Sequence, residues 1–95
     1  MIESSAVISE IRSLLETPAD DPPARHLVEH TLTNGYACAL RLEGEKLRIE
    51  HRLRSVVRGE AGGELGELTI ELSDADQELA HLRRLLSTLK AHALA

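Results

Sequence analysis

The stretch LGELTIELSDADQELAHLRRLLSTLKAHA, residues 65–93, decides the fold. Its small and large aliphatic residues recur at alternating steps of three and four: Leu65, Leu68, Leu72, Ala75, Leu79, Leu82, Leu86, Leu89 and Ala93. An α-helix has about 3.6 residues per turn, so this spacing places all nine on one face of a helix. The pattern therefore predicts a long helix over residues 65–94 with a single apolar stripe.

The segment 24–58 carries the same pattern less regularly. It contains no proline, and its apolar residues again follow one stripe: Val28, Leu32, Ala39, Leu42, Ile49, Leu53 and Val56. Two positions on that stripe are not apolar, Gly35 and Lys46. The pattern predicts a second long helix, and the Gly-rich segment GEAGGE, residues 59–64, predicts a turn between the two.

The N-terminal part predicts a short amphipathic helix over residues 5–16. Pro18 ends it, and TPADDPP, residues 17–23, is a linker that cannot continue a helix. Polar residues at the two helix starts are candidate N-caps, namely Ser4 or Ser5 for the short helix and Asp20 or Asp21, followed by Pro22 or Pro23 in the first turn, for the next.

These elements favour an all-α single domain, residues 1–95: an antiparallel, coiled-coil-like helical hairpin with a short N-terminal helix. An α+β fold is the alternative, because residues 36–53 and 67–72 also alternate between apolar and polar residues. That fold would hold a three-stranded meander at 36–72. Helices are favoured because residues 37–58 are dominated by Glu, Arg, Leu and Ala, which are good helix formers.

Charge is divided between the two long segments. Residues 46–58 are mainly basic, whereas residues 60–78 contain acidic residues and no Lys or Arg. Folding the chain back between them predicts these pairs: Arg58 with Glu64, Arg54 with Glu67 or Glu71, and Arg48 with Asp74 or Asp76. Each exposed pair contributes little, but together they favour an antiparallel register. The same acidic residues are expected to form salt bridges with the basic stripe of Arg41, Arg48 and Arg52.

Composition restricts the possible partners. The chain has 95 residues and a formal charge of −5, which argues against binding nucleic acid or an anionic membrane. Tyr36 is the single aromatic residue, so stacking platforms for bases are lacking. The single cysteine, Cys38, cannot form an internal disulfide and is expected to be a buried apolar residue. No secretory signal is recognised, and a cytoplasmic location is expected.

The string His26-Leu27-Val28-Glu29-His30 resembles the H-x-x-E-H signature of inverzincin metalloproteases. The resemblance implies His26 and His30 as metal ligands and Glu29 as the general base. It covers only five residues, and this chain lacks the large α/β domain from which that family takes its third ligand. His51, His81 and His92 are further candidate ligands. We expect no enzymatic activity, no cofactor and at most an adventitious metal at His26 and His30.

The sequence predicts a protein–protein interaction module, an adaptor, scaffold or small regulatory subunit, that self-associates. Two helices alone cannot bury both apolar stripes and the leucines beside them, so a second copy is the expected partner, together with an unidentified protein. The expected interface residues are Val28, Leu32, Tyr36, Leu40, Leu47, Leu72, Leu79, Leu82, Leu86 and Leu89. The alternative function is a metal- or ligand-responsive regulator that uses His26 and His30.

Overall fold

The structure is a computed structural model that describes residues 3–18, 20–59 and 65–94. Its helices are α1 (Ser4–Leu15), α2 (Arg25–Val57) and α3 (Leu65–Leu94). The expectation of an all-helical chain is confirmed, and each helix begins and ends within one residue of its predicted bounds. The three-stranded alternative is wrong, because the described residues between 36 and 72 are helical except for the turn at 58–59.

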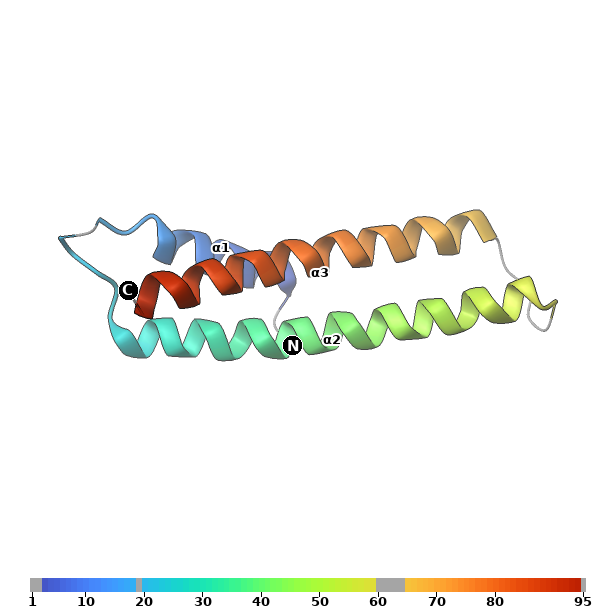
Figure 1. Cartoon of the computed structure of the whole chain (residues 1–95), viewed down its shortest axis with the longest axis horizontal. Helices are drawn as coiled ribbons and strands as arrows, with labels where there is room; N and C mark the ends of the chain where they lie inside the picture. Colours follow the sequence, from blue (N-terminus) through green and yellow to red (C-terminus); the bar gives the residue numbers. More distant parts are fainter. Residues whose placement is uncertain (1–2, 19, 60–64, 95) are drawn as a thin grey trace.

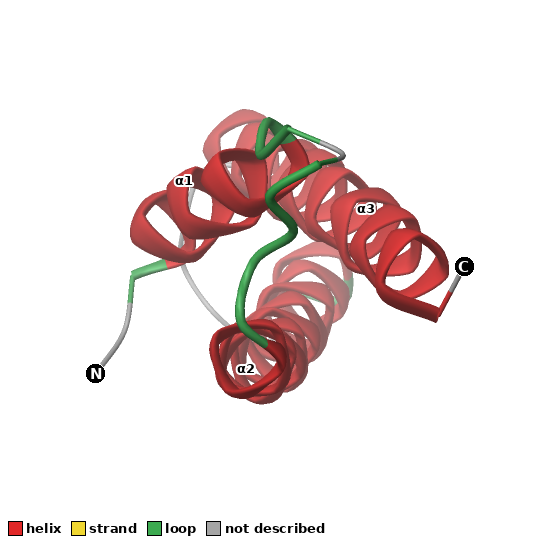
Figure 2. Cartoon of the chain, turned by 90° about the vertical axis from the view of Figure 1, so that its left-hand side faces the viewer, coloured by secondary structure: helices red, strands yellow, loops and turns green. Residues whose placement is uncertain are grey.

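The helices form an elongated molecule of 59 × 20 × 18 Å. α3 runs antiparallel to α2 along nearly its whole length, and α1 lies against both of them at one end (Figures 1 and 2). One end of the molecule is therefore a three-helix bundle. The other end, the two-helix arm, consists of the C-terminal part of α2 and the N-terminal part of α3 alone.

The core lies where the three helices meet. Val7 and Ile11 of α1 are completely buried there. They belong to one cluster with these residues of the two long helices: Val28, Cys38, Ala39, Leu42, Leu79, Leu82, Leu86 and Leu89. In the two-helix arm, by contrast, Leu68 and Ala75 are buried while Val57, Leu65 and Ile70 remain exposed. A pair of helices can bury only the facing stripe of each, so the arm keeps apolar surface in contact with solvent.

The helix starts differ from the predicted caps. The N-cap of α1 is Glu3, which makes no side-chain capping bond. Ser4 is instead the first helical residue, and its buried hydroxyl donates a hydrogen bond to Glu78 Oε1 of α3. This contact between helices uses the hydroxyl that a cap would need.

The second predicted cap is also wrong. The N-cap of α2 is Ala24, which has an extended backbone at φ −61° and ψ 136°, and the helix begins at Arg25. Pro22 and Pro23 precede the helix. A residue before proline is disfavoured in the α conformation, so Asp21 and Pro22 resist helical geometry and the helix begins after the second proline.

The end of α2 matches the predicted turn as far as it is described. Gly59 has a φ of +75°, and its N–H donates to the carbonyl oxygen of Val56 at 3.0 Å. A left-handed glycine just after the last helical turn is a common helix stop. The rest of the predicted turn, residues 60–64, lies outside the described residues.

Candidate interaction surfaces

Gly35 packs directly against Leu86 of α3. It is buried, and a Cβ atom placed on it would lie 2.3 Å from Leu86 Cδ2. The Leu86 side chain is itself 2% exposed. The leucine therefore fills the space that any larger residue at position 35 would occupy. The glycine that interrupts the apolar stripe in the sequence is a packing site in the structure.

Lys46, the other interruption of that stripe, links α2 to α3. Its Nζ donates to Asp76 Oδ1 at 2.7 Å. The hydrogen bond to Asp76 and the attraction of its carboxylate raise the pKa of Lys46 above the ordinary lysine value of 10.5. Glu43 and Arg83 form a second ion pair between the same helices. Both pairs join α2 to α3 in the antiparallel sense.

The predicted charge pairs are only partly realised. The structure places Asp76 opposite Lys46 rather than Arg48, a shift of two residues along α2. Within the described part of the chain, Arg48 and Arg54 are exposed and have no ion-pair partner. The expected pair of Arg58 with Glu64 lies outside the described residues. Part of the basic face of α2 is therefore left facing solvent.

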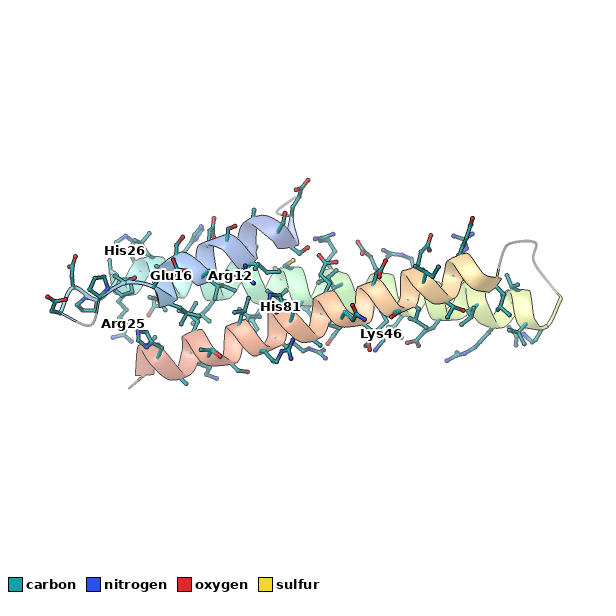
Figure 3. All side chains as sticks on the ribbon, turned by 90° about the horizontal axis from the view of Figure 1, so that it is seen from above. Arg12, Glu16, Arg25, His26, Lys46 and His81 are labelled. Carbon is teal, nitrogen blue, oxygen red and sulfur yellow. The ribbon has the colours of Figure 1, made fainter. Side chains whose placement is uncertain are left out.

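α1 is held by apolar packing and by two polar contacts to α3. Ser4 bonds Glu78, and Arg12 Nη2 lies 3.2 Å from His81 Nε2. Figure 3 shows Arg12 and His81 beside one another along the side where α1 and α3 meet.

On α2, Arg41 donates to Glu45 at 3.0 Å and to Cys38 Sγ at 3.6 Å. Cys38 is buried, as predicted from its apolar neighbours.

The ten predicted interface residues fall into two groups. Seven belong to the packing of the chain itself, buried or half-buried in it: Val28, Leu32, Leu72, Leu79, Leu82, Leu86 and Leu89. The other three remain exposed, Leu40 at 70%, Leu47 at 66% and Tyr36 at 46%. Only this second group offers a large apolar surface to a partner.

The three exposed residues lie on one face of α2 together with the half-buried Gly44. We call this face the outer face: Tyr36, Leu40, Gly44 and Leu47. Tyr36 and Leu40 border a shallow groove of about 430 Å³ that is completed by Ala39, Glu43, Arg83, Leu86 and Ser87. The groove places Tyr36 and Leu40 beside α3. The outer face points away from the core, and no described side chain covers Leu40 or Leu47.

A second groove of about 560 Å³ lies at the three-helix end, between the start of α2 and the end of α3. Its lining is mainly apolar and includes Arg25, Glu29, Lys90 and His92: Pro22, Pro23, Arg25, Val28, Glu29, Leu32, Leu89, Lys90, His92 and Ala93. Arg25 and Glu29 pair with one another at 3.0 Å.

The histidines that suggested a metal site are dispersed. His26 is exposed near the start of α2 (Figure 3), and His30 Nε2 lies 3.2 Å from the Asn34 side-chain nitrogen. His81 contacts Arg12 rather than another histidine. Among the described residues, no group of three or more His, Cys, Asp or Glu side chains is placed to hold a metal ion.

One buried residue of α2 was missed from the sequence. Thr31 is buried beside the apolar stripe, seven residues before the buried Cys38. That spacing of seven residues was the available signal. Gly44 was also missed: it lies in the middle of α2, and a Cβ atom there would meet nothing within 4 Å. The packing of the chain therefore gives no reason for a glycine at position 44.

Comparison with known proteins gives no match: no family model fits the sequence, and no curated protein or solved structure is significantly similar to it. The helices of the described residues are each too polar or too short to span a bilayer.

Proposed function

We propose that the chain is a non-catalytic helical interaction module, an adaptor, scaffold or small regulatory subunit, that self-associates. The observation that carries the proposal is the exposure of Leu40 and Leu47 on the outer face of α2, at 70% and 66%. Scattered exposed leucines are ordinary, but two in line beside a half-exposed tyrosine form a stripe. Tyrosine is among the residues enriched in protein interfaces.

The shape of the molecule supports the same proposal. In the two-helix arm each helix has a single helical neighbour, and Val57, Leu65 and Ile70 stay exposed. A coiled-coil-like hairpin with such an arm reduces its exposed apolar surface by packing against further helices. An antiparallel four-helix arrangement of two copies supplies them, and the same surfaces are open to a different helical protein.

Sedimentation equilibrium over a concentration series tests self-association. We expect a monomer–dimer equilibrium in the micromolar range, the weak end for protein interfaces. The double variant Leu40→Glu, Leu47→Glu is expected to remain monomeric while its circular dichroism spectrum stays helical, because both side chains project into solvent.

Leu27→Glu is the control. It places a glutamate on an exposed apolar residue of the same helix, 48% exposed, which lies nine residues before Tyr36 and therefore on the opposite side of α2. It is expected to leave association unchanged. Wild-type protein that stays monomeric throughout the concentration series would refute self-association, and equal loss of association in the control would move the interface away from the outer face of α2.

A further inference from the structure

The outer face of α2 has a symmetric arrangement of residues. The midpoint between Leu40 and Leu47 falls between Glu43 and Gly44, and the midpoint between Tyr36 and His51 falls at the same place. At 100° per residue, these four side chains lie within an arc of about 60° on the helix. A surface that is symmetric about its own centre is complementary to an identical surface running the opposite way.

Gly44 lies directly beside that centre, with Glu43 on its other side. Glycine is the least favourable helix residue after proline, so a glycine in the middle of a 33-residue helix calls for a structural reason. Gly35, in the same helix, has such a reason within the chain because Leu86 occupies the space beside it. Gly44 has none, since a Cβ atom at this position would meet no atom of the chain within 4 Å. A glycine on an outward helix surface lets another helix approach closely.

We propose that two copies of the chain pair through the outer faces of their α2 helices, antiparallel, with the twofold axis passing beside Gly44. This inference rests on the proposed self-association and specifies its geometry. Leu40 of each copy then packs against Leu47 of the other, and Tyr36 against His51. Gly44 of each copy then faces Glu43 of the other at the crossing point, and the absence of a side chain at position 44 leaves room for the two helices to approach.

Charge favours the antiparallel over the parallel alignment. Arg54 is exposed near the C-terminal end of α2 and has no ion-pair partner in the described part of the chain. In the antiparallel pair it faces Thr33 of the other copy, one helical turn from Glu29, which is about 6 Å along the axis and within reach of an arginine. Glu29 pairs with Arg25 of its own helix, so Arg54 would share its carboxylate with that arginine. In a parallel pair each Arg54 would face the other. The attraction is weak in energy but selects the alignment.

Two spin-label distances test this geometry. In a Cys38→Ala background, a nitroxide is attached at His30→Cys in one variant and at Val57→Cys in another, and double electron–electron resonance measures the separation between the two copies. Positions 30 and 57 lie equally far from the proposed centre, so both variants are expected to give the same distance, about 41 Å. Both positions are exposed, so the labels do not disturb the core.

A second test needs no change at Cys38. Gly44→Ala is expected to raise the melting temperature of dilute, monomeric protein, because alanine favours the helix and its methyl group meets nothing in the chain. The same substitution is expected to weaken dimerisation at least tenfold by separating the paired helices. Gly66→Ala is the matched control, since Gly66 is also helical and also has open space around it. It is expected to leave dimerisation unchanged.

The outcomes separate the geometry from the proposed function. Unequal label distances, equal short distances near 10 Å as in a parallel pair, or unchanged dimerisation in Gly44→Ala would overturn the α2 pairing and keep self-association. A wild-type chain that remains monomeric up to about 200 µM, well beyond the range expected for a small interface, would overturn both.

Discussion

Replacing Gly35 by alanine tests the contact between Gly35 of α2 and Leu86 of α3. The added Cβ atom would lie 2.3 Å from Leu86 Cδ2, 3.3 Å from Cγ and 3.4 Å from Cδ1. Carbon atoms pack at about 3.5–4.0 Å, so the nearest pair would have to separate by more than 1 Å. Leu86 is 2% exposed and has core neighbours around it, so it cannot swing into solvent. The leucine must change rotamer or the helices must move apart.

The magnitude follows from two opposing terms. Overfilling a packed core costs about 1–3 kcal/mol, and replacing glycine by alanine in a helix interior returns about 1 kcal/mol. We expect a net loss of about 1 kcal/mol in the free energy of unfolding. For a domain of this size that corresponds to a decrease of about 4–8 °C in the melting temperature. Urea unfolding of dilute protein followed by circular dichroism measures the loss.

Gly35→Ala in a protein that already carries Leu86→Ala tests whether Leu86 causes this loss. Leu86→Ala alone is expected to cost about 2–5 kcal/mol through the cavity it leaves. It also removes the atoms that the new methyl group meets, so Gly35→Ala in that background should become stabilising, by up to about 1 kcal/mol. The sign of the effect thus reverses, which is a coupling of about 2 kcal/mol between neighbouring positions. Equal destabilisation by Gly35→Ala in both backgrounds would show that Leu86 is not the cause.

Three further outcomes are expected. Ile11→Ala should cost about 2–5 kcal/mol in urea unfolding, because Ile11 is completely buried between α1 and the two long helices, and a loss under about 1 kcal/mol would show that α1 packs weakly. Because the hydrogen bond to Asp76 raises the pKa of Lys46, the stabilisation it gives is present below pH 10.5 and is lost as the pH rises further. The melting temperatures of wild type and Lys46→Met should therefore differ at neutral pH and converge above pH 10.5, and a constant difference would contradict this origin. Calorimetric titration with Zn²⁺ should show no binding tighter than micromolar and no change in His30→Ala, whereas tight binding lost in that variant would revive the metal-responsive alternative.

The helices could be predicted from the sequence because their signals are local. Alternating steps of three and four over residues 65–93, the proline-rich linker at 17–23 and the glycine at position 59 each act within a few residues, and they fixed the helix ends to within one residue. The two caps were wrong because they depend on more than residue type. Ser4 bonds a distant residue of α3, and the consecutive prolines delay the start of α2.

The surfaces were harder to predict because they depend on which helix faces which. The sequence shows that Leu40 and Leu82 are apolar, but only the docking of the three helices leaves one 70% exposed and buries the other completely. In the sequence, Gly35 only interrupts the apolar stripe of α2. The structure explains it, because Leu86, 51 residues away, lies beside it. The charge blocks indicated the antiparallel sense of α2 and α3, whereas the identity of the pair, Lys46 with Asp76, required the side-chain positions.

The burial of Cys38 gives the chain an internal reporter. This thiol, the sole one in the sequence, is 4% exposed and belongs to the same cluster as Val7 and Ile11. A reagent that alkylates thiols reaches the sulfur only when α1 swings off or the long helices part, which is a local opening of the native state. The rate at which wild-type protein is alkylated therefore measures how often the three-helix bundle opens locally, with no foreign probe attached.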